Sequence, residues 1–396
     1  MEHRERPDTT DAGQTVTRRT ALAGAAAIGA GAALLGSDTL PALAGGAPVT
    51  IAQRGTGPAM NFVLSHEQFP VPRLVEYGAA AERTGFDGIW TSDHFQPWQD
   101  NQSHAGQAWV TLSAITQRTS RIRLGTGVTT PTFKYRPAIV AEAFASLSLL
   151  APGRIFLGLG TGEKLNEGAA GGGWALYPER AARLVEAVQI IRGLWSGQPV
   201  NFNGQYYQVN GKLYDPPAQP IPIYIAAGGP KSARLAGQYG DGLVADPLQL
   251  MTNPGYKAAF AEGARAAGKD PSKMPILLEH FVVVGDMNEA MRDAELWRFT
   301  AKSWKPGYFN NISPVAIRKR AEAEIPLQTV FANWPVSTDP NVHIQAIQKL
   351  VTMGVTHVFV HSAQQDQLGV IDYFSRYVLP KVRNGGVTGV RQVNGL

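Results

Sequence analysis

The chain has 396 residues, of which 44% are hydrophobic and 17% are charged, and its formal net charge is +5. This is the composition of a globular protein with a large core, and because the basic residues are scattered rather than clustered, we expect no nucleic-acid partner. The sequence has no cysteine, which excludes thiolate catalysis, cysteine-based zinc sites, disulfides and lipoprotein anchoring.

Residues 1–44 differ in composition from the rest and have three parts. Arg18 and Arg19 follow a polar leader, an apolar run rich in Ala and Gly comes next, and the small residues ALA end the segment. This layout is typical of a twin-arginine export signal. The alternative is a membrane-spanning helix, but a span needs roughly 20 apolar residues and this run is shorter. We therefore expect recognition by the twin-arginine export machinery and a location in the cell envelope, its periplasm-like space or the medium. Residues 45–59 would form a flexible mature N-terminus.

From residue 60 onward, short apolar runs alternate with amphipathic stretches that begin at Pro or end at Gly, which predicts alternating strands and helices. The expected strands are 60–64, 88–90, 122–126, 154–159, 221–226, 242–245, 276–284 and 357–360. The expected helices are 72–85, 107–119, 138–150, 178–195, 230–239, 253–268, 340–353 and 365–382. A hairpin around Asn203-Gly204 interrupts this order, and a mixed helical region runs to about residue 325.

Eight β/α units without a linker predict a single (β/α)8 TIM-barrel catalytic domain with insertions over residues 60–396. The alternative is a doubly wound open sheet, which usually carries a Gly-rich turn after its first strand. Here the first strand is followed by Ser65-His66-Glu67, so we expect the barrel. The segment GLGTGE has the wrong spacing for a dinucleotide motif, and we interpret it as a rim loop that delivers Glu163.

In such a barrel, ligands bind at the carboxyl ends of the strands. Asp93 and His94 follow the second predicted strand, Glu163 follows the fourth, and small residues end several strands. The segment Ala226–Gly229 leads into a helix that starts at Pro230, where free N–H groups favour an anion such as a phosphate. A plain tight turn remains the alternative for this segment.

His94 is the candidate for proton transfer, because imidazole titrates near neutral pH and the neighbouring carboxylate could orient it. Trp98 would share its face if the segment makes a helical turn, and core packing is the alternative. Glu163 suits an acid role, or else a helix-capping network with Asn166. We expect no metal site, because His357 and His361 are four apart on a strand and cannot share one ion.

The segments TSDHFQPW, LGTGVTTPTFKYRPA, RIFLGLGTGEKLNE, LWSGQPVNFNGQYYQV and IPIYIAAGGP together resemble the coenzyme F420-dependent glucose-6-phosphate dehydrogenase family of the luciferase-like barrels. The resemblance implies a luciferase-like TIM barrel with the deazaflavin F420 at its mouth, taking a hydride from an alcohol carbon. It implies that His94 is the base, that Trp98 stabilises the transition state and that Glu163 serves the proton needs of the reduced ring. It also implies a bulge at Gly127-Val128 behind the ring, often a non-proline cis bond. By the same resemblance the cofactor contacts are Asp93, His94, Gly127, Val128, Thr161, Gly162, Glu163, Asn166, Ala226, Ala227, Gly228 and Gly229.

The sequence departs from the sugar-phosphate members of that family, which hold the phosphate with Lys and Arg. Gln249 and Asn333 stand at those places, and a late insertion is rich in aromatic residues. The chain is therefore most similar to the exported branch, the F420-dependent hydroxymycolic acid dehydrogenases, which oxidise a secondary alcohol of an envelope lipid to a ketone. We expect a lipid or small-molecule alcohol substrate, peripheral envelope association and a homodimer. The alternatives are an F420-dependent sugar dehydrogenase, an FMN-dependent monooxygenase and an exported binding protein without turnover.

Overall fold

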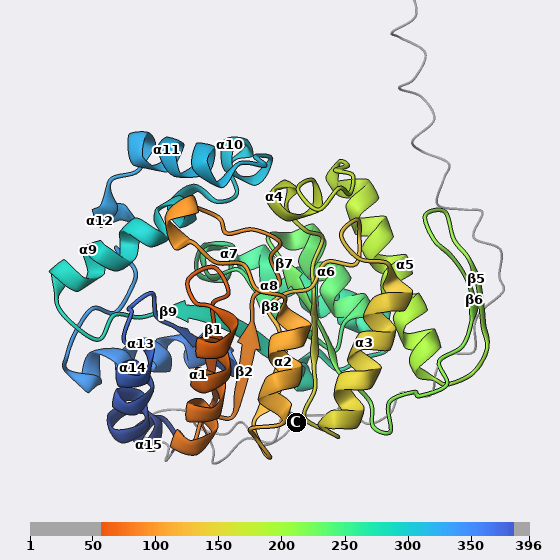
Figure 1. The fold of residues 1–396 in the computed structure, drawn as a ribbon, viewed down its shortest axis with the longest axis horizontal. Coiled ribbons are helices and arrows are strands. Elements are labelled where there is room, and N and C mark those ends of the chain that lie inside the picture. Colours follow the sequence, from red (N-terminus) through yellow and green to blue (C-terminus); the bar gives the residue numbers. More distant parts are fainter. Residues whose placement is uncertain (1–56, 384–396) are drawn as a thin grey trace, which may run out of the picture. The chain divides into compact units, whose positions relative to one another are not determined.

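The computed structural model describes residues 57–383, so the predicted export signal and most of the predicted flexible N-terminus lie outside the described residues. Eight parallel strands form one sheet in the order β3-β2-β1-β10-β9-β8-β7-β4 (Figure 1). Isolated parallel bridges Leu124↔Ile155 and Thr129↔Leu159 join the two outer strands, β3 and β4, so the sheet closes into a barrel. The predicted TIM-barrel architecture is confirmed, and the open doubly wound alternative is excluded.

The barrel strands fall where the sequence predicts them, with shifts of a few residues at their ends. Their bounds are β1 Ala59–Leu64, β2 Gly88–Thr91, β3 Arg123–Thr126, β4 Leu157–Leu159, β7 Ile223–Ala227, β8 Gly242–Ala245, β9 Ile276–Phe281 and β10 His357–His361. The predicted hairpin is also present, as β5 Val200–Asn203 and β6 Gln208–Gly211, and within residues 57–383 these two strands pair only with each other.

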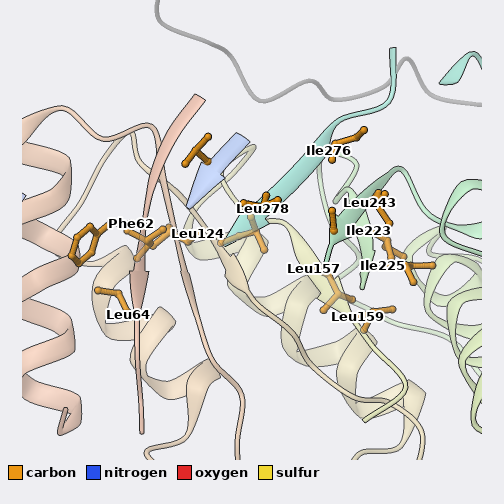
Figure 2. Packing of buried hydrophobic residues seen from close by; sticks show 14 of the residues in the cluster. Phe62, Leu64, Leu124, Leu157, Leu159, Ile223, Ile225, Leu243, Ile276 and Leu278 are labelled. Carbon is orange, nitrogen blue, oxygen red and sulfur yellow. The ribbon is translucent and has the colours of Figure 1, made fainter. Parts of the chain in front are cut away.

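The two faces of each barrel strand pack against different layers, because successive side chains of a strand point to opposite faces. Phe62 and Leu64 of β1 join the cluster between the sheet and the outer helices, which Figure 2 shows in part. Val63, between them, points into the barrel and belongs to a separate aromatic cluster. In that interior cluster Trp90 and Phe359 stack with ring centroids 3.8 Å apart, so the barrel is a filled core.

The outer helices follow the strands and carry the expected termini. Helix α1, for example, ends at Gly85, whose φ of 100° is the left-handed conformation that glycine adopts most easily. The helices that surround the strands are α1 Val71–Thr84, α2 Ala108–Thr116, α3 Pro137–Leu150, α5 Tyr177–Trp195, α6 Pro230–Tyr239, α8 Pro254–Ala266, α13 Pro340–Thr352, α14 Gln367–Tyr373 and α15 Leu379–Arg383, with a π-helical turn at Phe374–Val378. Within residues 57–383, no helix is both long and apolar enough to span a membrane.

The late insertion, residues 287–330, builds a helical segment that we call the lid. It consists of α9 Met287–Leu296, a 3-10 turn Arg298–Lys302, α10 Pro306–Phe309, α11 Pro314–Glu324 and α12 Leu327–Val330. Figure 1 shows α10 and α11 on the same side as α4 (Lys164–Glu167), the short helix that follows β4. Short elements at the mouth also include α7 Pro247–Thr252 after β8 and the 3-10 turn Asp100–Gln102, while the 3-10 turn Pro271–Lys273 leads into β9.

Candidate active site

A buried carboxylate and an imidazole form the centre of the candidate site. The Nδ1 atom of His94 lies 2.6 Å from Oε1 of Glu67. Glu67 is buried, and its other carboxylate oxygen accepts hydrogen bonds of 2.7 Å from the hydroxyls of Ser65 and Ser92. Both residues follow the carboxyl ends of neighbouring strands, β1 and β2, so this pair belongs to the mouth of the barrel.

The two groups shift each other's protonation. Burial favours a neutral Glu67, but His94 and the two serine hydroxyls outweigh that effect and lower the pKa of the carboxyl. Burial likewise disfavours a charged His94, but the charge and contact of Glu67, helped by Glu163, raise the pKa of the imidazole. His94 is therefore a stronger base than an ordinary histidine.

Asn166 joins the loop after β2 to the loop after β4. Its Oδ1 accepts a 2.8 Å hydrogen bond from the backbone N–H of Phe95, and its Nδ2 donates one of 3.5 Å to Oε2 of Glu163. Glu163 is the N-cap residue of α4, but its side chain makes no capping hydrogen bond. The structure thus brings His94 and Glu163 to one mouth, as the sequence predicts.

Trp98 lies beside His94, with ring centroids 5.6 Å apart and an edge-to-face angle of 80°. The segment does not make the helical turn that would place Trp98 on the face of His94: residues 95, 96, 98 and 99 form bends, and the first helical turn after β2 begins at Asp100. Trp98 is placed instead by stacking on Phe299 of the lid, at 4.6 Å and 17°. Its indole therefore joins the imidazole to the lid.

Asp93 faces an internal polar network. Its carboxylate accepts hydrogen bonds from Thr129 Oγ1 at 2.6 Å and Tyr135 OH at 3.0 Å, and it pairs with Lys134 Nζ at 2.8 Å. Asp93 is 2% exposed, so its acceptor positions are largely used within the protein. Its contact with a bound cofactor stays a prediction.

The bulge at Gly127-Val128 has the predicted non-proline cis peptide bond. A Cβ at Gly127 would lie 2.5 Å from Cδ2 of the buried Trp90 ring, so only glycine fits there without a shift. A Cβ at Gly160, at the end of β4, would lie 2.8 Å from Cγ2 of Val128. The bulge therefore packs directly against the β4 end.

The loop after β4 encloses a second buried acid, Glu167. Gly162 has φ 79°, and a Cβ there would also lie 2.5 Å from Oε1 of Glu167. Burial raises the pKa of Glu167 to about 7, although hydrogen bonds from the Thr130 hydroxyl and the Lys134 backbone N–H oppose the shift. Thr161 and Gly162, both predicted cofactor contacts, thus lie in a loop whose inner side holds a carboxyl that titrates near neutrality.

The end of β7 offers a backbone surface next to the start of α6. A Cβ at Gly229 would meet no atom within 4 Å, so this backbone is open, whereas a Cβ at Gly228 would lie 3.2 Å from Cη2 of Trp304 in the lid. Ala226 and Ala227 precede them on the strand, with only Ala227 fully buried. Gly228 therefore lies against the lid, Ala227 packs in the core, and Gly229 leaves its backbone open before α6.

The two places that would carry cations in sugar-phosphate enzymes are uncharged here. Gln249 accepts a 2.9 Å hydrogen bond from Nδ2 of Asn253, and Asn333 is exposed. The lid instead contributes an apolar cluster. Its buried aromatic members include Trp297, Phe299 and Tyr308, together with Trp98 and Phe331.

Within residues 57–383, no group of three or more acidic or histidine side chains is arranged to hold a metal ion. His361 pairs through Nδ1 with Glu279 Oε1 at 2.6 Å and stacks on Phe281. His357 is buried at the opposite end of β10, where burial lowers its pKa to about 3. The two histidines of this strand therefore have separate surroundings.

Sequence reasoning did not select Glu67 or Glu167 as functional residues. The signal for Glu67 was available in the strand register. Leu64 of β1 pairs with Thr91 of β2, and Glu67 and His94 each lie three residues further along. The register places the loops after β1 and β2 next to each other at the mouth, and the turn at residues 66–68 brings Glu67 to His94.

Comparisons with known proteins show the family of this chain. Residues 52–357 match the family model described as luciferase-like monooxygenase. The chain is 48% identical over 372 residues to an F420-dependent hydroxymycolic acid dehydrogenase of Mycobacterium tuberculosis, which covers 93% of this chain and 99% of that protein. It is 39% identical over 334 residues to an F420-dependent glucose-6-phosphate dehydrogenase of Gordonia bronchialis, covering 82% of this chain and 97% of the relative.

One solved structure is also similar along its whole length. It is an F420-dependent secondary alcohol dehydrogenase in complex with an F420-acetone adduct, with a TM-score of 0.77 and 34% identity, covering 83% of this chain and 100% of that chain. The family resemblance that the sequence motifs indicate is confirmed.

Proposed function

This chain belongs to the luciferase-like monooxygenase family, and we propose that it is a coenzyme F420-dependent alcohol dehydrogenase. The single observation that carries the proposal is the pairing of His94 with the buried Glu67 at the barrel mouth, 2.6 Å apart, next to Trp98. Hydride leaves a carbinol carbon more easily when its hydroxyl is deprotonated, and a positioned base contributes roughly 10²–10⁴-fold to such a step.

The residues at the mouth fit F420, the cofactor on which the similar proteins depend. The cis bulge at Gly127-Val128 packs on the Trp90 ring through the Gly127 side, so its peptide would support a flat ring from behind. The open backbone at Gly229, before the N-terminus of α6, suits a phosphate. Thr161, Gly162 and Asn166 would contact the cofactor from the β4 side. When bound, F420 supplies a deazaflavin ring that accepts the hydride.

Each catalytic side chain has one role in this proposal. Glu67 holds Nδ1 of His94, which leaves Nε2 to take the hydroxyl proton of the substrate. Trp98 covers the imidazole edge and keeps water from it. Glu163, held in place by Asn166, exchanges a proton with the reduced ring.

We propose a secondary alcohol of an envelope lipid, a hydroxymycolic acid that becomes a ketomycolic acid, as the substrate. The uncharged Gln249 and Asn333 would hold a phosphate dianion poorly, whereas the aromatic lid suits an apolar chain. The 48% identical relative is named for this activity. The 39% identical relative is named for glucose 6-phosphate oxidation, so a sugar phosphate is the second candidate substrate. Export by the twin-arginine route, envelope association and a homodimer complete the proposal.

Equilibrium titration of the purified protein with F420, FMN and NADP, followed by an alcohol screen, tests this function. We expect saturable F420 binding and F420 reduction with secondary alcohols, with lipid alcohols preferred to glucose 6-phosphate. Tight FMN binding with oxygen consumption would favour a monooxygenase. F420 binding without reduction by any alcohol would favour a binding protein.

A further inference from the structure

Arg180 of α5 holds the loop that follows β4 from behind. Its Nη1 donates to the backbone oxygens of Thr161 at 3.3 Å and Gly162 at 3.1 Å, and to the Thr161 hydroxyl at 3.3 Å. Its Nε donates to the backbone oxygen of Ala175 at 3.2 Å. The side chain is thus attached to both ends of the loop 161–175. Arg180 is 5% exposed.

The same guanidinium packs against the lid. Its Cζ lies 4.1 Å from the ring centroid of Trp174 and 5.2 Å from that of Phe309 in α10. The two rings meet edge to face at 5.5 Å, and Nε1 of Trp174 donates a 3.0 Å hydrogen bond to Oδ1 of Asn310. One side chain therefore contacts the β4 loop with its edge and the lid with its face.

The charge of Arg180 is also part of this arrangement. Burial lowers the pKa of Arg180, and the carboxylates of Glu163 and Glu167 oppose that lowering. The cation therefore lies close to both acids of the β4 loop, one of which we place at the reduced ring.

We propose that Arg180 is a positioning residue that couples the cofactor-contact loop to closure of the lid. This inference rests on the proposed function for the identity of the cofactor. The fixed Thr161–Gly162 backbone would present its outer side to F420, while the Trp174–Arg180–Phe309 stack keeps α10 over the mouth. Cofactor binding and lid order would then depend on the same guanidinium.

Lysine cannot replace Arg180 in this role. Its ammonium is a point charge without the planar fork that reaches several carbonyl oxygens, and it offers no flat face to two rings. Arg180→Lys therefore separates coupling from charge, because it keeps the positive charge near Glu163.

The test compares Arg180→Lys with wild type in two measurements. The first is the F420 dissociation constant, and we expect an increase of about tenfold or more. The second uses the cofactor-free protein: we expect trypsin to cleave several-fold faster after Lys302, which lies in the lid, is 39% exposed at its side chain and is followed by Ser303. Arg183→Lys is the matched control, because Arg183 lies one turn further on α5, pairs with Glu179 at 2.8 Å and stacks on Phe133. Both measurements should stay within about twofold for this control.

Phe309→Leu and Trp174→Leu each remove one ring that packs on Arg180, so they test the contact with the lid separately. They also replace Arg180→Lys in the test if that variant does not fold. Phe309→Leu keeps the hydrogen bonds to the loop, so we expect faster cleavage after Lys302 and a higher KM for the alcohol, with F420 affinity within about twofold. Trp174→Leu should also speed cleavage. The inference is wrong if Arg180→Lys keeps the wild-type F420 dissociation constant and the wild-type rate of cleavage. It is also wrong if Phe309→Leu and Trp174→Leu are both cleaved at the wild-type rate. Wild-type protein that does not bind F420 would overturn the proposed function instead, and the cleavage measurement would still test the lid contact.

Discussion

Glu67 and His94 lie 2.6 Å apart because β1 and β2 are neighbouring parallel strands in a fixed register. Leu64 pairs with Thr91, where both strands end, and Glu67 and His94 follow three residues later in the adjacent loops. Strand pairing thus brings together the two loops that carry the proposed catalytic pair. The buried carboxylate raises the pKa of its partner against the opposing effect of burial.

Glu67→Gln should lower the pKa of His94, because the carboxylate that stabilises the imidazolium is removed. An alcohol oxidation that needs neutral His94 rises with pH as the imidazole loses its proton, so this limb of the kcat/KM profile should move to lower pH. The plateau should fall roughly tenfold, because a weaker and less firmly held base remains. The measurement is kcat/KM for F420 reduction from pH 5 to 9. Glu76→Gln, an exposed acid of α1, is the control, and an unshifted limb in Glu67→Gln would contradict the assignment.

Gly127→Ala should weaken cofactor binding. The added Cβ would lie 2.5 Å from the Trp90 ring inside the barrel, so the bulge or the ring must move. We expect the F420 dissociation constant to rise about tenfold, with a loss of stability of about 1–3 kcal/mol from overpacking. Fluorescence titration and thermal denaturation measure both. Gly211→Ala is the control, since a Cβ there meets no atom within 4 Å, and an unchanged dissociation constant at residue 127 would count against a cofactor at this bulge.

Asp293→Asn should stabilise the protein increasingly as pH rises. Burial raises the pKa of Asp293 to about 8, well above the value of about 3.9 in an unfolded chain. Between those values the folded state binds more protons than the unfolded state, so wild-type stability falls with pH through this group. The variant lacks that fall, and its advantage should grow by a few kcal/mol between pH 4 and pH 8 and then level off. Urea denaturation at several pH values checks this, with the surface variant Asp372→Asn as control. A pH-independent difference would show that Asp293 titrates normally.

Local patterns in the sequence could predict the barrel and half of the site. Strand ends are marked by short apolar runs and glycines, so His94 and Glu163 could be placed at the mouth before the fold was seen. Glu67 could not be found by pattern, because its partner is distant in sequence and only the β1–β2 register brings the two together. Arg180 gives no signal on an amphipathic helix, since its contacts are to backbone oxygens of a loop.

The structure of the lid is the part of the fold that the sequence predicted least. Its helices are short and irregular, and their placement depends on contacts such as Trp98 on Phe299. For the same reason the sequence could not settle how Trp98 reaches His94, because the segment makes no helical turn before Asp100. Tertiary stacking set the position of this ring, and periodicity carries no information about it.

The most direct test of the account is F420 reduction by the His94→Ala variant at saturating cofactor and a secondary alcohol. His94 lies at the proposed proton-transfer site, so removal of its imidazole should leave the F420 dissociation constant within about threefold of wild type. The rate of F420 reduction should fall by roughly 10²–10⁴-fold. A variant that binds F420 and still reduces it within a few-fold of the wild-type rate would contradict the assignment of His94 as the base.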